Sequence, residues 1–247
     1  MLSEFAEGVW FDTGPTHFLG LRLTVNMTVL RVADGLLVHS PLPMTPERRR
    51  AVEAIGHVAH LYAPNTFHHQ WLGEWNLAFP SAVVHAPAEL GSKRPDLRID
   101  RFHDRPDAYD FGGHIAEVPI RGFRLVETAL VYLPGRTAVV TDLVHNIGRP
   151  THGWTKFYTR LMGFYDRVAI SRVIRWTAFD DKGAARRSLD ALLDHAFEGL
   201  VVGHGAPIPD FGRDALARAT AWLPAASPRL PAAPAKRPAF FSAKPCG

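Results

Sequence analysis

The stretch LYAPNTFHHQWLGEW, residues 61–75, holds two adjacent histidines between an apolar segment and a helix-like one. The residues around its start, HVAHLYAP (57–64), have the apolar character of a buried strand that Pro64 ends. The segment QWLGEWNLAF (70–79) has the pattern of a short helix that Pro80 stops. His68 and His69 therefore lie in a loop at a strand end, where α/β proteins carry binding and catalytic residues.

The segments around this loop alternate between strands and helices. Asp34-Gly35 joins two apolar runs and is a strong hairpin signal. Thr45 as N-cap, with Pro46 after it and Gly56 as terminator, predicts a helix over 45–56. Other segments predict strands at 27–33, 35–40, 57–64, 81–87, 114–120, 125–133, 137–144 and 200–208, and helices at 70–79, 153–176 (interrupted), 185–199 and 214–223. These elements predict one layered α/β domain over residues 1–223.

Composition narrows the class of protein. Apolar residues make up 47% of the 247 residues and charged residues 21%, which is typical of a globular protein. Residues 224–247 are rich in Pro and Ala, and we expect this tail to be disordered or loosely packed. The single cysteine, Cys246, excludes an intramolecular disulfide framework, and the N-terminal residues lack the basic region of a secretory signal. We therefore expect a cytoplasmic protein.

The net charge of +4 does not by itself indicate an anionic partner. The arginines are scattered without the aromatic interleaving of a nucleic-acid groove. No apolar run approaches the roughly 20 residues that cross a bilayer. We expect a small-molecule substrate or ligand as partner, and neither nucleic acid nor a membrane.

Polar side chains stand at the ends of three apolar strands. Asp142 ends TAVVTD, His204 ends LVVGHG, and the pair His68-His69 follows 57–64. Taken singly, each is also a common turn former. Taken together, three imidazoles and one carboxylate at one sheet edge would suit Zn²⁺, and Fe or Mn equally by ligand type.

The order of elements resembles the metallo-β-lactamase superfamily over most of residues 5–210. The motif positions of that superfamily correspond to GLLVHSP, APNTFHHQWLG, RGFRLVE, TAVVTD and LVVGHG. The resemblance implies a four-layer αββα sandwich. More narrowly, APN-x-x-HH-x-x-x-GEW with a following KRPDL resembles an allied bacterial family of unknown function.

Departures from the superfamily pattern affect the first of its two metal positions. If His68-His69 is aligned with the Asp-His pair of the main motif, the motif's two earlier histidines fall on Pro64 and Thr66. If the alignment is instead anchored at Gly73, the motif's histidines are replaced by Asn65, Phe67 and Gln70. Phe123 stands where the Gly-His turn would have its histidine. The resemblance then implies a remodelled, mononuclear site with His68, His69, Asp142 and His204 as ligands.

Three functional interpretations follow. The first is a metal-dependent hydrolase of a small ester, lactone or thioester. It would hold one divalent metal, with Zn as the first choice and Fe or Mn as alternatives. His68 would be a ligand or a proton shuttle, and Glu127 a general base or an extra ligand. Glu127 could instead pair with Arg124 or Arg94. The second is a catalytically degenerate member of the fold that binds a ligand or a partner protein. The third is an iron site for redox chemistry, supported only by ligand type.

Overall fold

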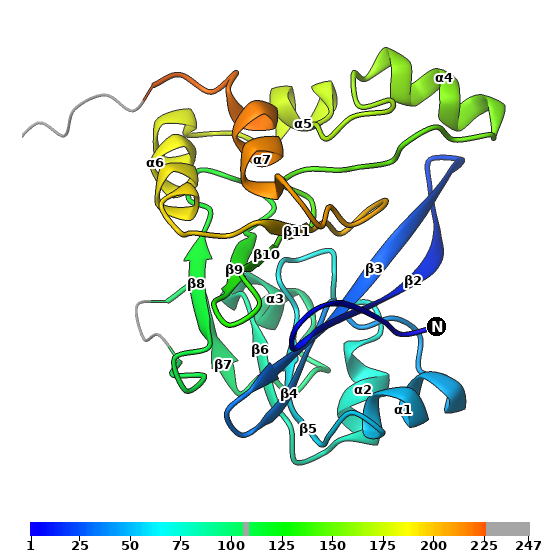
Figure 1. The fold of residues 1–247 in the computed structure, drawn as a ribbon, viewed down its shortest axis with the longest axis vertical. Helices are drawn as coiled ribbons and strands as arrows, with labels where there is room; N and C mark the ends of the chain where they lie inside the picture. The colour runs from blue at the N-terminus through cyan, green and yellow to red at the C-terminus, as the bar shows by residue number, and fades with distance from the viewer. Residues whose placement is uncertain (106–108, 226–247) are drawn as a thin grey trace, which may run out of the picture.

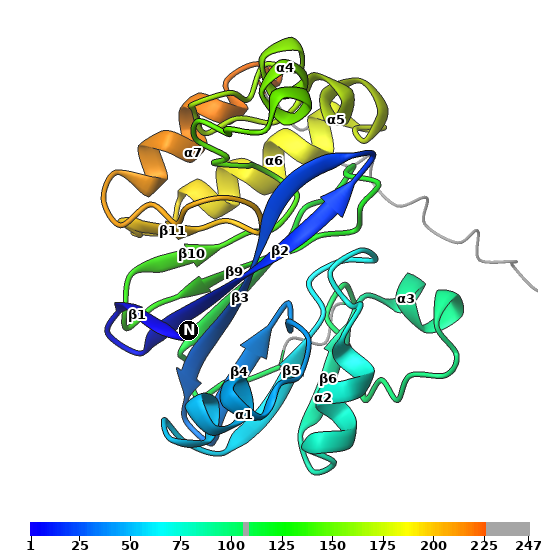
Figure 2. The same cartoon turned by 90° about the vertical axis from the view of Figure 1, so that its right-hand side faces the viewer.

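Two β-sheets lie face to face between two layers of helices in the computed structural model, which describes residues 1–105 and 109–225 (Figure 2). The strands are β1 (Ser3–Ala6), β2 (Val9–Phe18), β3 (Leu21–Val32), β4 (Gly35–His39), β5 (Val58–Tyr62), β6 (Val83–Ala86), β7 (Arg101–Phe102), β8 (Ile115–Pro119), β9 (Thr128–Tyr132), β10 (Thr137–Val139) and β11 (Gly199–Val201). The helices are α1 (Pro46–Glu53), α2 (Leu72–Ala78), α3 (Ala88–Lys93), α4 (Gly153–Leu161), α5 (Arg172–Thr177), α6 (Lys182–Leu193) and α7 (Gly212–Thr220). The predicted four-layer αββα sandwich is confirmed.

The larger sheet runs in the order β1-β2-β3-β4-β5-β6-β7 and the smaller one β11-β10-β9-β8. Strands β1 to β4 pair antiparallel, and β4 to β7 pair parallel. In the smaller sheet only β10 and β11 are parallel. Helices α1, α2 and α3 cover the outer face of the larger sheet, and α6 and α7 cover that of the smaller one (Figure 1).

Three apolar clusters match these layers. Leu30, Leu37, Tyr62 and Leu130 belong to the cluster between the two sheets. Trp75 of α2 belongs to the cluster beneath the larger sheet. A third cluster joins the smaller sheet to α6 and α7. Because apolar side chains fill both faces of each sheet, the polar loops at the strand ends are the places left for chemistry.

The N-terminal hairpin is the main difference from the predicted elements. Strands β1 and β2 were not expected, and β3 begins at Leu21, earlier than the predicted 27. Asp12, Gly14 and Pro15 interrupt any apolar pattern in β2. Strand β2 nevertheless pairs with β3 from Val9 to Phe18, and β1 covers only its first residues, so Pro15 faces an open edge that needs no N–H donor.

The smaller differences concern helix ends and the tail. Helix α3 was not predicted, and α6 ends at Leu193 rather than 199 because the chain turns there into β11. Most of the predicted tail, 226–247, lies outside the described residues. Among the residues that are described, no helix is long and apolar enough to span a membrane.

Candidate metal centre

Three side chains from three separate strand ends meet at one edge of the sandwich. His68 lies in the turn after β5, Asp142 follows β10, and His204 follows β11. The Nε2 atoms of His68 and His204 lie 3.4 Å from Oδ2 and Oδ1 of Asp142, respectively. One ligand atom from each residue falls within 4.8 Å of the other two. One oxygen of the Asp142 carboxylate therefore faces each imidazole, and the two rings contact each other edge to face, with their centroids 5.0 Å apart.

Hydrogen bonds at Nδ1 fix the direction of both imidazoles. Nδ1 of His68 lies 2.8 Å from Oγ of Ser40, and Nδ1 of His204 lies 2.8 Å from the carbonyl oxygen of Thr24. A carbonyl only accepts, so Nδ1 of His204 donates, and in the neutral ring its Nε2 keeps a lone pair. This arrangement, in which the second ring nitrogen is held by a backbone or side-chain oxygen, is typical of metal-binding histidines.

Ser40 was not among the predicted site residues. It directly follows β4 and adopts a left-handed backbone conformation, with φ of 51°. Its N–H donates to the carbonyl of Tyr62, which holds the end of β4 against the end of β5. A non-glycine residue in this conformation is uncommon and often marks a functional position. The strained turn places the hydroxyl of Ser40 at the ring of His68.

Asn65 connects the His68 turn to Asp142. Its Oδ1 accepts the N–H groups of Phe67 and His68, both at 2.8 Å. Its Nδ2 donates to Oδ2 of Asp142 at 2.8 Å and to Oγ1 of Thr141 at 3.0 Å. The sequence carried a signal for the first role, because Asn commonly accepts backbone N–H groups two residues on in turns.

Glu127 supports the Asp142 loop from inside the protein. Its carboxylate is buried and accepts the backbone N–H groups of Thr141, Asp142 and Leu143 at 2.7, 2.8 and 3.1 Å. Burial, together with the nearby charge of Asp142, raises the pKa of Glu127 to about 7, against the lowering effect of these hydrogen bonds. The expected pairing of Glu127 with Arg124 or Arg94 does not occur; the carboxylate is a backbone acceptor.

The charges of the three candidate ligands are complementary. Burial disfavours the charged form of Asp142, but the two histidines beside it hold its pKa well below the usual range. Burial likewise disfavours the charged form of His204, yet the Asp142 carboxylate beside it, together with the Thr24 carbonyl, raises its pKa. The centre thus carries an ionised carboxylate at neutral pH, which a cation requires.

Comparison with known proteins identifies the fold. No protein-family model matches the sequence, and no curated protein matches it. Among solved structures, a metallo-β-lactamase from Pontibacter korlensis has a TM-score of 0.61 at 11% identity, covering 90% of this chain and 98% of its own. This chain has the metallo-β-lactamase fold. A metallo-β-lactamase of Pseudomonas aeruginosa in the mono-zinc form has a TM-score of 0.56 at 13% identity, with coverage of 90% and 94%. The metal-soaked flavodiiron core Flv1 of Synechocystis sp. has a TM-score of 0.63 at 13% identity, with coverage of 90% and 60%.

His69 does not reach the centre in this version of the metallo-β-lactamase fold. Its Nδ1 lies 3.4 Å from Nη1 of Arg94, and burial, with Lys93 and Arg94 nearby, lowers its pKa. Of the four predicted ligands, His68, Asp142 and His204 come together and His69 lies apart from them, because consecutive side chains in this turn point to different surroundings. The general-base assignment of Glu127 also departs from the structure, since its oxygens face the backbone of 141–143.

Two further histidines lie beside the three. The ring of His145 packs 5.5 Å from that of His204, and no hydrogen bond joins it to Asp142 among the described residues. His39 stacks on Tyr62 at 5.7 Å, with both ring nitrogens buried and without a partner in the described part of the chain. Burial lowers the pKa of each to about 3, so both rings are neutral at pH 7.

The three residues fit a divalent metal. Ligand atoms about 2.1 Å from a tetrahedral zinc lie about 3.4 Å from one another. The two measured N–O separations are 3.4 Å, longer than the usual hydrogen bond of about 2.7–3.2 Å. These two separations are therefore compatible with a shared cation, and all three ligand atoms lie within 4.8 Å of one another. At the position of the superfamily's Gly-His turn, Phe123 packs on Phe179 at 4.7 Å and offers no ligand.

Proposed function

We propose that His68, Asp142 and His204 hold one divalent cation and that the protein is a metal-dependent hydrolase of a small ester, lactone or thioester. The observation that carries this proposal is the convergence of three ligand atoms within 4.8 Å. The Nδ1 contacts of both histidines give the proposal its second support. Zinc is the first candidate, with iron and manganese as the alternatives that the same ligand types allow.

Three protein ligands suit catalysis better than the four expected from the sequence. Catalytic zinc sites keep one coordination position open, whereas four protein ligands close a tetrahedral site. When bound, the cation would act as a Lewis acid toward a water molecule or a substrate oxygen. The side chains of His68, Asp142 and His204 retain 6%, 13% and 17% exposure, so the centre is accessible from one side.

The surrounding residues have supporting roles in this proposal. Asp142 supplies the negative charge, and Ser40 and the Thr24 carbonyl orient the two imidazoles. Asn65 and Glu127 hold the loops that carry His68 and Asp142. Because each ligand is held by a partner from another element, the centre is formed before a cation arrives.

The adjacent histidines provide a matched test. The protein and its His68→Ala, His69→Ala and His204→Ala variants would be freed of metal with chelator, titrated with Zn²⁺ by calorimetry and assayed on p-nitrophenyl acetate and a simple lactone. We expect about one equivalent of zinc on the parent and on His69→Ala, and loss of binding in the other two. Zinc binding that depends on His69 but not on His68 would contradict the ligand set.

The alternative proposal is a protein that binds a ligand or a partner without catalysis. The loss of the superfamily's other histidines supports it, since Pro64, Thr66 and Phe123 occupy their positions. The same experiment separates the two proposals. Zinc binding without hydrolysis of any ester, lactone or thioester tested would favour the binding protein, whereas hydrolysis that disappears with His204→Ala would exclude it.

A further inference from the structure

Helix α4 turns its apolar side outward. Its buried residues are Thr155 and Thr159, which are small and polar. Trp154, Phe157 and Leu161, spaced three and four residues apart, form a stripe on the opposite, exposed side. A surface helix of a globular protein normally shows the reverse arrangement. The core therefore does not explain why this helix carries aromatic residues.

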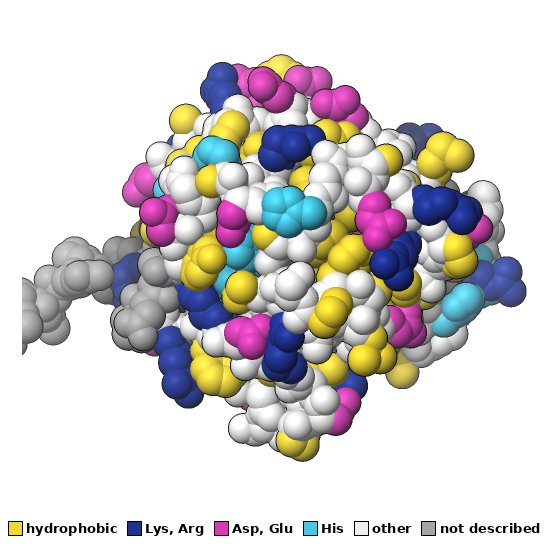
Figure 3. All heavy atoms as spheres, turned by 90° about the horizontal axis from the view of Figure 1, so that it is seen from below, with side chains coloured by type: hydrophobic (Ala, Val, Ile, Leu, Met, Phe, Trp, Pro, Cys, Tyr) yellow, Lys and Arg dark blue, Asp and Glu magenta, His cyan; other side chains and the backbone are white. Residues whose placement is uncertain are grey.

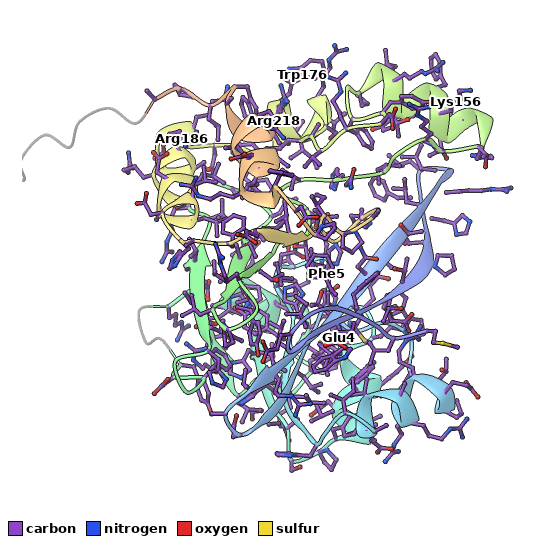
Figure 4. The ribbon with its side chains drawn as sticks, in the orientation of Figure 1. Glu4, Phe5, Lys156, Trp176, Arg186 and Arg218 are labelled. Atoms are coloured by element: carbon purple, nitrogen blue, oxygen red, sulfur yellow. The ribbon has the colours of Figure 1, made fainter. Side chains whose placement is uncertain are left out.

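Two neighbouring elements extend the stripe. The indole N–H of Trp154 donates to the carbonyl of Leu19 at the β2–β3 tip, at 3.1 Å, and Leu19 is 70% exposed. At the other end of α4, the side chain of Arg172 donates to the carbonyl of Leu161, which joins α4 to α5. Trp176 of α5 is 72% exposed. Figures 1 and 2 place the β2–β3 tip, α4 and α5 at the same end of the molecule, and Trp176 and Lys156 lie there in Figure 4. We call these three elements the aromatic face.

The aromatic face is also strongly basic. Residues 149–177 contain six Arg or Lys against one Asp, a formal charge of +5 where the whole chain has +4. The one acidic residue, Asp166, is paired with Arg149 at 2.6 Å. Lys156 and Arg160 are exposed beside the aromatic stripe and form no ion pair within the described residues. Exposed rings and cations that form no ion pair among the described residues thus share one surface.

We propose that the aromatic face binds the surface of an anionic lipid bilayer. An interfacial helix has aromatic and aliphatic residues that enter the headgroup region and Lys or Arg residues that meet anionic lipids. The α4 stripe with Lys156 and Arg160 has this composition. The binding is peripheral, and it is independent of the metal proposal.

Two other partners fit the same surface less well. Single-stranded RNA would use the rings for base stacking and the cations for phosphate, but it has no use for exposed aliphatic residues such as Leu19 and Leu161. A second copy of this chain would bring two basic surfaces together. The opposite end of the molecule, by contrast, shows basic and acidic side chains interspersed (Figure 3).

This proposal differs from the sequence expectation of no membrane partner. That expectation rested on the absence of a spanning segment and on the scatter of arginines along the chain. In the folded protein, residues that are distant in sequence, such as Leu19 and Trp154, are in direct contact.

Vesicle co-sedimentation tests the proposal on the full chain. Vesicles of phosphatidylcholine mixed with phosphatidylglycerol would be compared with pure phosphatidylcholine, at low and high salt. We expect binding to the mixed vesicles only, weakened by salt. The double substitution Lys156→Glu with Arg160→Glu should lower the partition coefficient at least about tenfold, because each basic residue near an anionic surface is worth about 1 kcal/mol. Phe157→Ser and Trp176→Ser should each lower it several-fold.

Matched control variants distinguish vesicle binding by the aromatic face from a general effect of net charge or surface hydrophobicity. Arg49→Glu with Arg50→Glu makes the same charge change on α1, and Leu77→Ser removes an apolar residue that is 84% exposed on α2. Both should bind vesicles as the parent does. The proposal would be overturned if the controls lost as much binding as the face variants, or if the protein did not bind the mixed vesicles. It would also be overturned by tighter binding of oligouridylate than of vesicles, or by a dimer that Phe157→Ser dissociates.

Discussion

Substitution of Asn65 by alanine should both destabilise the fold and weaken the candidate metal centre. The side chain is fully buried and makes four hydrogen bonds. Two backbone N–H groups, at Phe67 and His68, would lose their acceptor at a cost of about 1 kcal/mol each. The hydrogen bond to the Asp142 carboxylate adds about 1.5–3 kcal/mol. We therefore expect Asn65→Ala to lower the free energy of unfolding by about 3–5 kcal/mol.

Asn76 gives the matched control. Its Oδ1 is buried in α2 without a partner among the described residues. Alanine is the better helix former, so Asn76→Ala should leave stability unchanged or raise it by about 0.5 kcal/mol. Urea unfolding followed by circular dichroism measures both variants, and zinc calorimetry should show affinity weakened about 10–100-fold in Asn65→Ala alone. A loss below about 1 kcal/mol in Asn65→Ala, or an equal loss in both variants, would refute this reasoning.

Three other predictions test separate parts of the structure. Ser40→Ala removes the hydroxyl that holds His68, and we expect zinc affinity to fall about 10–100-fold while the melting temperature of the metal-free protein changes little; unchanged affinity in calorimetry would exclude the orienting role. Burial and nearby charges lower the pKa of His85 to about 2, below the unfolded value of 6.5. The stability that the neutral His85 ring contributes is therefore fully present above pH 6.5. Below pH 6.5 the free energy of unfolding falls by about 1.4 kcal/mol per pH unit, because the unfolded chain takes up a proton there that the folded chain does not. Urea titrations at pH 6.5 and 5 should show this slope reduced in His85→Gln, and an unchanged slope would contradict it. Gly122→Ala should destabilise the protein by about 1–3 kcal/mol more than Gly113→Ala. Both glycines have positive φ, but only at Gly122 would the new Cβ lie 2.1 Å from the carbonyl oxygen of Asp181. Equal melting temperatures of the two variants would contradict this prediction.

The sequence determined the layers and most of the elements. Apolar runs and their terminators predicted all but the N-terminal hairpin, α3 and the two-residue strand β7, because a buried strand or helix needs a continuous or periodic apolar pattern. Asp142 and His204 were found for the same reason, since each is the first ionisable residue after a buried strand. These signals lie in neighbouring residues, so they can be recognised from the sequence alone.

The tertiary structure alone decided which of two adjacent histidines reaches Asp142. His68 and His69 have nearly the same local sequence, and their directions are set by Ser40 and Asn65 on one side and by Arg94 on the other. The aromatic face depends on folding in the same way, because its members are separated by more than a hundred residues. Contacts between distant segments leave no periodic trace in the sequence, and these contacts orient the side chains of the centre and expose those of α4.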